Sequence, residues 1–279
     1  MTKIISFQGF KGAYSDMACH AVYPDHETLP CVGFRDAFMA VENGEADLAM
    51  IPVDNTLAGR VADVHHLMPQ SHLNIIGEHF QPIRHALMGV KGAKIKDIKH
   101  VHSHVHAIPQ CRKVISELGI ESHIHVDTAG AAKEVAERKN KAHAAIASEL
   151  AAKIYGLEIL RGDVQDADHN TTRFLILSPK PEKPYLKEES CITSLLFTVR
   201  NIPAALYKCL SGFATNGLSM SKLESYVDPN FDAAQFYVDV DGHCDSEAFR
   251  NALEELGFFA RNVRILGCYK AHDFRKPSC

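Results

Sequence analysis

The sequence predicts an α/β protein in two parts, a larger amino-terminal part and a smaller carboxy-terminal one. Up to residue 178, short apolar runs alternate with helical patterns, which is typical of helices layered on a mostly parallel sheet. Residues 179–190 hold three prolines and six charged residues and are expected to form an interdomain linker. Beyond the linker, the expected order is strand, helix, strand, strand, helix, strand.

Length and composition agree with this division. A chain of 279 residues is long enough for two cores, and 46% hydrophobic with 23% charged residues is ordinary for a globular protein. The net charge of -4 favours neither nucleic acid nor an acidic membrane surface. The apolar runs are too short for a membrane span, and the opening residues are too short for a signal peptide. The eight scattered cysteines are typical of reduced thiols, so we expect a cytoplasmic protein.

The first 77 residues open with a strand and a glycine-punctuated loop, Gln8 to Ser15. Phe34, Ala37, Phe38 and Val41 recur at helical spacing, and Gly44 is a suitable stop. The elements expected here are a strand at 4–7, helices at 16–22 and 34–41, a strand at 48–53 and a helix near 61–68.

The strand–helix alternation continues through the next hundred residues. Pro109 suits the first turn of a helix, and Gly119 and Gly156 suit helix ends. The elements expected here are strands at 101–102, 124–126 and 144–147 and helices at 108–118, 128–139 and 148–155. The apolar run that follows Thr172 and Arg173 is expected to be a buried strand.

The carboxy-terminal part matches the βαββαβ order of ferredoxin-like domains. Asp228, Pro229 and Asn230 are expected to turn its central hairpin. The elements expected here are strands at 192–199, 218–226, 234–240 and 263–269 and helices at 203–215 and 246–256.

Four polar clusters stand where an expected strand ends and a helix begins. N-capping alone explains each one, but ligands of open α/β sheets bind at this edge, where helix starts also attract anions. With Thr172 and Arg173 directly before a buried strand, the clusters together predict a site for a small anion. They are Gly12-Ala13-Tyr14-Ser15, Asp54-Asn55-Thr56, Ser103-His104 with Gln110, and Asp127-Thr128-Ala129.

These motifs, in this order, resemble the prephenate dehydratase family across nearly the whole chain. The matching pieces include Gln8-Gly9 with Gly12-Ala13-Tyr14-Ser15, the run from Ile51 to Gly59, Ser103-His104 with Gln110-Cys111, and Thr172-Arg173-Phe174. The carboxy-terminal part resembles an ACT regulatory domain through the run from Asn201 to Leu206 and through Leu223-Glu224-Ser225-Tyr226.

The resemblance implies a two-lobed catalytic domain of the periplasmic-binding-protein-like (type II) fold over residues 1–178. One lobe would hold about 1–77 and 170–178, and the other about 78–169. The linker would then be 179–190, the ferredoxin-like βαββαβ ACT domain 191–272, and a tail 273–279.

The family converts prephenate to phenylpyruvate, water and carbon dioxide in phenylalanine biosynthesis, which implies a prephenate dehydratase that needs no cofactor and is feedback-inhibited by L-phenylalanine. It also implies a homodimer or a dimer of dimers. By resemblance, the catalytic residues are Asn55, Ser103, Gln110, Thr172 and Arg173, with Arg173 as carboxylate anchor. Further substrate contacts are expected from Gly12, Ala13, Tyr14, Ser15, Thr56, His104, Thr128 and Phe174. Effector contacts are expected from Asn201, Pro203, Ala204, Ala205, Leu206, Glu224 and Ser225.

The chemistry expected of Thr172 follows from its hydroxyl. A threonine hydroxyl is a poor acid at neutral pH, so we expect it to donate a hydrogen bond to the departing hydroxyl group of the substrate, or to pass a proton through water. A guanidinium suits a carboxylate because it offers two parallel N–H donors.

The chain departs from the family pattern at several positions. Asp54 replaces a glutamate, and Val105-His106 replaces Pro-Gln. The second change creates His102-x-His104-x-His106, a spacing that suits zinc on a strand. Its predicted position at a strand-to-helix junction and the absence of an acidic or cysteine partner pattern argue against a metal, and none is expected.

In the ACT-like part, Ala204 replaces a common glycine and Tyr226-Val227 replaces Arg-Pro. The strength of phenylalanine binding is therefore open. Two alternatives remain: arogenate dehydratase, whose substrate differs only in an amino group, and a non-catalytic amino-acid sensor.

Overall fold

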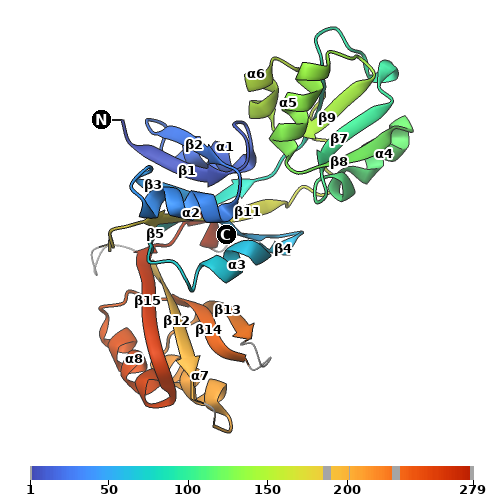
Figure 1. Cartoon of the computed structure of the whole chain (residues 1–279). Coiled ribbons are helices and arrows are strands. Elements are labelled where there is room, and N and C mark those ends of the chain that lie inside the picture. The colour runs from blue at the N-terminus through green and yellow to red at the C-terminus, as the bar shows by residue number, and fades with distance from the viewer. Residues whose placement is uncertain (1, 185–189, 201, 228–232, 277–279) are drawn as a thin grey trace. The chain divides into compact units, whose positions relative to one another are not determined.

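The computed structural model describes residues 2–184, 190–200, 202–227 and 233–276. The chain divides into two compact units, one of Met1–Gln70 with His79–Phe174 and one of Ser71–Glu78 with Leu175–Cys279. Three sheets carry the fold, and helices cover them (Figure 1).

The first sheet has the strand order β2-β1-β3-β11-β5, with β4 paired to β3. Strand β1 is parallel to β2 and β3, and β4 is antiparallel. Ile5, Phe7 and Ile51 are fully buried here, as the apolar runs predicted. The strands are β1 (Ile4–Gln8), β2 (Glu27–Cys31), β3 (Leu48–Asn55), β4 (Gly59–Arg60), β5 (Asn74–Pro82) and β11 (Thr171–Ser178). The helices are α1 (Tyr14–Val22), α2 (Phe34–Glu42) and α3 (Ala62–Leu67).

The second sheet has the strand order β10-β6-β9-β7-β8. Strand β7 is parallel to β8 and β9, whereas β6 is antiparallel to β9 and β10. The strands are β6 (Ala86–Gly89), β7 (His100–His104), β8 (Glu121–His125), β9 (His143–Ala147) and β10 (Glu158–Arg161). The helices are η1 (Ile95–Asp97), η2 (Ile108–Cys111), α4 (Arg112–Leu118), α5 (Thr128–Arg138) and α6 (Glu149–Tyr155).

Both sheets are mixed, although a mostly parallel sheet was predicted. The missed strands include β2, β6 and β10. Strand β2 contains Pro30 and β10 alternates irregularly, so neither shows the apolar run that identifies a buried strand. The predicted helix over 108–118 begins as the 3-10 turn η2 before α4, with Pro109 near its start.

The third sheet confirms the predicted βαββαβ order. Its strand order is β13-β14-β12-β15 and its paired strands are antiparallel. Leu195, Phe213, Val238 and Phe249 form the buried centre between this sheet and its two helices. The elements are β12 (Cys191–Val199), α7 (Ala205–Thr215), β13 (Met220–Val227), β14 (Ala233–Asp241), α8 (Glu247–Phe259), β15 (Ala260–Lys270) and η3 (Asp273–Arg275). The predicted turn at 228–230 lies outside the described residues.

Ala204, which caps the amino end of α7, has a φ of 59° and a ψ of 26°. This left-handed conformation is natural for glycine but strained for a residue with a Cβ atom. The family's preference for glycine here is therefore explained by backbone geometry.

We expect Ala204→Gly to stabilise the unit that contains the third sheet. Relief of left-handed strain contributes about 1–2 kcal/mol, and the added freedom of the unfolded chain removes about 0.4–1 kcal/mol. The net gain of about 0.5–1 kcal/mol can be measured by urea unfolding. Ala205→Gly, inside the helix and under no such strain, should destabilise the protein. A loss of stability in Ala204→Gly would contradict the strain.

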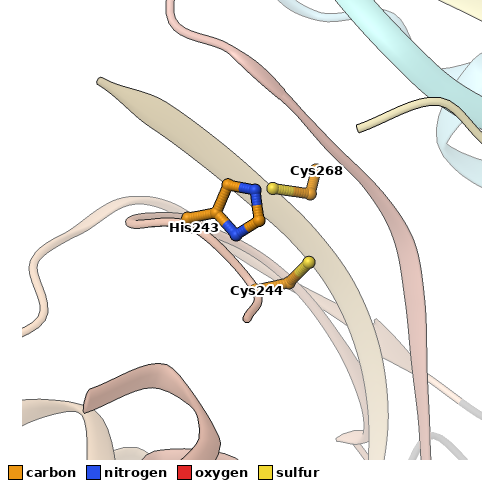
Figure 2. Close-up of side chains that lie close together, drawn as sticks. All are labelled: His243, Cys244 and Cys268. Carbon is orange, nitrogen blue, oxygen red and sulfur yellow. The ribbon is translucent and has the colours of Figure 1, made fainter. Parts of the chain in front are cut away.

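His243, Cys244 and Cys268 converge inside the same unit (Figure 2). The ring of His243 is fully engaged, since Nδ1 accepts from the Asp245 amide at 3.0 Å and Nε2 donates to the Pro184 carbonyl at 2.8 Å. Burial raises the pKa of the Cys244 thiol to about 12. These three side chains therefore pack as buried parts of this unit, and the Cys244 thiol is neutral.

Over the residues that the structure describes, no helix combines the length and the apolar character needed to cross a membrane.

Candidate functional site

A pocket of about 700 Å³ lies in the first unit, where strands of the first and second sheets end. Nine of the residues predicted from the sequence line it: Ala13, Tyr14, Ser15, Asn55, His104, Gln110, Thr128, Thr172 and Phe174. These residues come from the carboxyl ends of β3 and β7, the amino-terminal half of β11, the turn η2 and the starts of α1 and α5. The structure therefore brings together the strand-end clusters that were separate in the sequence.

Thr172 is held at the pocket by Asn55. The Asn55 side-chain amide donates to Thr172 Oγ1 at 2.9 Å and to Asn170 Oδ1 at 2.7 Å. Its own oxygen accepts from the amides of Leu57 and Ala58, at 3.0 and 2.8 Å. These two backbone donors fix which end of the Asn55 amide faces Thr172. Because the Thr172 oxygen is an acceptor in this bond, its O–H is left to donate into the pocket.

A chain of hydrogen bonds continues from Asn55 to His85. The buried Asn170 donates to Gln110 Oε1 at 2.7 Å, and the same oxygen lies 3.3 Å from His85 Nε2. The other ring nitrogen of His85 lies 2.8 Å from the Tyr14 hydroxyl. The same hydroxyl lies 2.6 Å from the Arg84 carbonyl, so its single proton is shared between that oxygen and the His85 ring nitrogen.

The direction of these bonds determines the protonation of His85. The Asn55 orientation requires Asn170 to accept with Oδ1, so Asn170 donates to Gln110, which must accept with Oε1. His85 Nε2 therefore carries a proton, and Nδ1 is the acceptor when the ring is neutral. The Thr172 hydroxyl is thus linked to the neutral His85 ring by hydrogen bonds between the side-chain amides of Asn55, Asn170 and Gln110.

Burial favours the neutral ring. His85 is 3% exposed, and burial lowers its pKa from 6.5 to about 4, against the opposing effect of the Gln110 hydrogen bond. Burial also raises the pKa of the Tyr14 hydroxyl well above 10. Both groups are thus neutral at physiological pH.

We expect acid to weaken this part of the fold through His85. Between pH 6.5 and 4 the unfolded chain binds a proton that the folded chain does not, so stability falls as the pH falls through this window. Moving from pH 7 to pH 5 should remove about 2 kcal/mol through this residue. Urea unfolding of wild type and His85→Gln at both pH values measures the difference. Equal losses in the two proteins would contradict the assignment.

The loop before α1 approaches α5 and α6 closely. A Cβ on Gly12, whose φ is 89°, would lie 2.8 Å from the Ala151 Cα, and the Gly12 carbonyl accepts a hydrogen bond from Ser148. A Cβ on Gly9 would lie 2.8 Å from a carboxylate oxygen of Asp127. Glycine is required here because the backbone itself is the packing surface.

Asp127 lines the pocket and caps α5 by accepting from the Gly130 amide at 2.8 Å. Burial raises the pKa of its carboxyl group. His104, at the end of β7, also lines the pocket, and burial with nearby His106 and His125 lowers its pKa. Asp63 and His106 also line the pocket, so these two groups are part of a larger set of titratable neighbours of the substrate space.

Four predicted residues lie outside the pocket lining. In two of them the hydroxyl already forms hydrogen bonds with backbone groups. Ser103 is fully buried and donates to the Ile146 carbonyl at 2.6 Å. Thr56 donates to the His169 carbonyl at 2.9 Å and accepts from the Thr171 amide at 3.0 Å. Ser103 and Thr56 thus hold backbone segments next to the pocket in place and do not line it. Gly12 is the third and supports the loop.

Arg173 is the fourth. It is 6% exposed, and its guanidinium lies 3.9 Å from Asp54, away from the pocket lining. Side chains alternate along a strand, so Thr172 and Phe174 face the pocket while Arg173 points to the other side.

The sequence interpretation missed His85, Asn170 and Arg60. Arg60, on β4, is the one arginine or lysine among the described residues that line the pocket. Asn170 stood in the motif that ends in Thr172 and could have been noticed there. His85 has no local signal, since its partner Gln110 lies 25 residues away.

The predicted effector residues occupy the start of α7 and strand β13. Ala205 is buried, and Leu206 packs on the core. Glu224 forms an ion pair with Lys222 at 2.7 Å, and Ser225 lies on the opposite, exposed side of the strand. Pro203 is exposed, and Asn201 lies outside the described residues.

Fold and pocket together define a two-lobed α/β enzyme that carries a C-terminal domain consistent with an ACT domain. The family model for prephenate dehydratase matches residues 5–182. The chain belongs to the prephenate dehydratase family, whose members are lyases.

Known relatives extend this match over almost the whole chain. The chain is 48% identical over 275 residues, 98% of both chains, to a Komagataeibacter europaeus protein named bifunctional N-acyl-homoserine lactone acylase/prephenate dehydratase. It is 37% identical over 280 residues to arogenate dehydratase/prephenate dehydratase 2, chloroplastic, of Arabidopsis thaliana, covering 95% of this chain and 72% of the relative.

A solved structure gives the same result for the fold. The prephenate dehydratase of Arthrobacter aurescens in complex with L-Phe superposes with a TM-score of 0.89 at 29% identity, over 99% of this chain and 92% of that one. The predicted fold class, periplasmic-binding-protein-like lobes followed by an antiparallel α/β domain, is confirmed.

Proposed function

We propose that this enzyme converts prephenate to phenylpyruvate with Thr172 as the hydrogen-bond donor to the departing hydroxyl group. The observation that carries the proposal is the bond from Asn55 to Thr172 Oγ1, which directs the threonine O–H toward the pocket. The direction of this donor is set before the substrate binds, so little energy is spent on reorienting it during the reaction. Preorganised donors of this kind accelerate a reaction because they stabilise the charge that develops in the transition state.

The reaction balances with one added proton. The bond between the ring and its carboxylate breaks to release carbon dioxide, and that electron pair moves into the ring as the carbon–oxygen bond breaks. The hydroxide leaves as water after taking one proton, and the ring becomes aromatic. Since Thr172 is a poor acid, the proton comes from solvent, and Asp127 and His104 are two of the titratable pocket groups that can pass it on.

The substrate carries two carboxylates, and the pocket offers several places for them. Arg60 supplies a cation, and the starts of α1 and α5 supply backbone N–H groups at Tyr14, Ser15 and Thr128. Holding both carboxylates fixes the ring above Thr172, so orientation contributes to catalysis.

We expect Arg60→Met to raise the KM for prephenate about tenfold, the effect of losing about 1.4 kcal/mol of binding, with a smaller change in kcat. The matched control is Arg84→Met, because Arg84 pairs with Asp163 at the surface and its side chain is 71% exposed. Steady-state kinetics of both variants measure the change in KM for prephenate. An unchanged KM in Arg60→Met would remove Arg60 from the site.

The activity itself is tested by incubating purified protein with prephenate and measuring phenylpyruvate, with and without L-phenylalanine. Turnover that phenylalanine lowers supports both the reaction and its regulation. Stabilisation by phenylalanine with turnover of neither prephenate nor arogenate would favour the amino-acid sensor.

Arogenate is the alternative substrate of the same chemistry, and relatives at 37% identity carry arogenate dehydratase in their names. The two substrates differ in an amino group in place of a keto oxygen. We propose prephenate as the preferred one, and competition of the two substrates in one reaction measures the preference.

A second activity is suggested by the relative named as an acylase, which is 48% identical over 98% of both chains. We therefore propose hydrolysis of the amide of N-acyl-homoserine lactones as a further candidate function. Release of homoserine lactone tests it. Ser103 is a poor nucleophile candidate since it is fully buried and bonded to Ile146. Parallel assays of Thr172→Val show whether both activities share one pocket.

We propose that L-phenylalanine binds the C-terminal domain and that two copies of the chain pair there, as a homodimer or a dimer of dimers. The edge strand β13 exposes Leu223 and Val227, at 44% and 60%, which suits pairing of two copies. Light scattering tests the assembly, and a monomer at micromolar concentration would contradict it. We also propose a cytoplasmic location, since the described cysteines form no disulfide.

A further inference from the structure

Three donor groups meet at the amino ends of β7 and β8, outside the pocket lining. His100 Nδ1 lies 3.1 Å from His123 Nε2 and 3.3 Å from a carboxylate oxygen of Glu121. His123 Nε2 lies 3.8 Å from the other oxygen of Glu121. We propose that His100, Glu121 and His123 bind a divalent transition-metal ion, Zn²⁺ being the best fit.

The distances suit a tetrahedral ion. Zinc binds imidazole nitrogen and carboxylate oxygen at about 2.0–2.2 Å, which places neighbouring ligand atoms about 3.3–3.5 Å apart. The separations of His100 Nδ1 from His123 Nε2, 3.1 Å, and from one Glu121 oxygen, 3.3 Å, lie close to this value, and the other Glu121 oxygen lies 3.8 Å from His123 Nε2. A metal therefore fits after small rotations of three side chains, with no movement of the backbone.

The register of the parallel strands creates this geometry. His100 pairs with Glu121, and His102 pairs with His123 two residues further along β7 and β8. Successive residues of a strand point to opposite faces, so His100 and His102 share one face with Glu121 and His123. The sequence spacing His102-x-His104-x-His106 suggested a different triad, because the strand partners across the sheet were not visible in it.

Two further imidazoles hold the ligands in place. His100 stacks on His143 with ring centres 4.7 Å apart, and His123 stacks on His102 at 4.9 Å. His102 and His143 share a hydrogen bond of 2.8 Å. The ligand rings are thus supported on one side while their nitrogen atoms remain directed at Glu121.

Metal binding requires neutral imidazoles, and the titratable and charged groups around this cluster come from β7, β8, β9 and α5. Burial and the neighbouring histidines lower the pKa of His102 to about 4, and burial also lowers the pKa of His143. From α5, Arg138 disfavours protonation of His102 whereas Glu134 favours it, and these two residues form an ion pair with each other. On the partner strand, Glu121 is the carboxylate that faces the ligand pair.

The site is open enough to take up an ion. The side chains of His100, His123 and Glu121 are 31%, 39% and 67% exposed. Water can therefore complete a fourth position. Two imidazoles with one carboxylate suit zinc and its neighbours in the first transition row, and not Mg²⁺ or Ca²⁺, which prefer oxygen ligands alone.

A metal here would fasten an edge strand. Strand β8 stands last in the order β10-β6-β9-β7-β8, and among the described strands it pairs with β7 alone. A bridge from His123 to His100 adds a link between the two strands at the end opposite the pocket. The ion would therefore stabilise the second sheet by mass action and leave the chemistry at Thr172 unchanged.

The test uses the full chain without a polyhistidine tag, freed of metal by a chelator and dialysed against ZnCl₂. One zinc ion per chain is expected by metal analysis, together with a rise in Tm. His123→Gln and Glu121→Gln each remove a metal ligand and should lower the affinity for zinc. The loss should exceed the roughly tenfold to hundredfold that follows when a residue that only supports a ligand is removed. Dehydratase activity of His123→Gln should equal that of wild type, since this residue lies outside the pocket lining.

Two controls locate the ion. His143→Gln alters the stacked group but no ligand, and His243→Gln alters the buried cluster of His243, Cys244 and Cys268. Both should retain a bound zinc ion. Cobalt substitution should give a visible spectrum without a thiolate charge-transfer band. Absence of binding in wild type, unchanged binding in His123→Gln and Glu121→Gln, or a thiolate band that His243→Gln abolishes would each overturn the proposal.

Discussion

Replacing Thr172 with valine is expected to lower kcat for prephenate about 10²–10³-fold, the cost of removing one well-placed donor to a developing oxyanion. Valine keeps the shape of threonine and its preference for strands, so β11 should form as before. The hydroxyl is the sole group lost. Because it acts on the departing group, the effect should appear in kcat more than in KM.

Two matched variants make the result specific. Thr172→Ser keeps a hydroxyl within reach of Asn55 and should retain most of the activity. Thr171→Val makes the same change one position earlier, on the strand face that points away from the pocket lining, and should be near wild type. Equal kcat in Thr172→Val and wild type would refute the role of this hydroxyl, whatever the controls show.

The Thr172 network also shows what the sequence can predict. The motif at the carboxyl end of β3 located Asn55 at the pocket, as expected for ligand sites of α/β sheets, whereas Gln110 reaches it from η2 and Thr172 from the amino-terminal start of β11. The facing of Arg173 could have been predicted too, since a strand with Thr172 in the pocket must turn the next residue away.

Other members of the network lie beyond local patterns. Asn55 meets Asn170 across 115 residues, and Asn170 meets Gln110 across 60. The roles of His85 and Glu121 likewise depend on which strands become neighbours. The prediction of a mostly parallel sheet failed because the antiparallel strands β6 and β10 are short and lack strong periodicity, so the sequence did not reveal them.

The carboxy-terminal residues expected to be a tail include a structural anchor. Arg275 binds Glu78 through two parallel bonds, Nε to Oε1 at 2.6 Å and Nη2 to Oε2 at 2.9 Å. The Glu78 side chain is fully buried, and its Oε1 also accepts from the His272 amide at 3.0 Å. A buried carboxylate of this kind depends on its partner, because the charge has been taken out of water.

Arg275→Met is therefore expected to cost about 3–5 kcal/mol, since it leaves the Glu78 charge buried without its guanidinium. The double variant Glu78→Met with Arg275→Met should recover much of this loss, because a matched apolar pair carries no desolvation cost. Lys276→Met is the surface control, since Lys276 and Asp273 are 69% and 78% exposed, and it should leave stability unchanged. Hydrogen–deuterium exchange of β15 peptides reports local opening in this unit. If Arg275→Met exchanged no faster than Lys276→Met, the ion pair would be a surface contact and not an anchor.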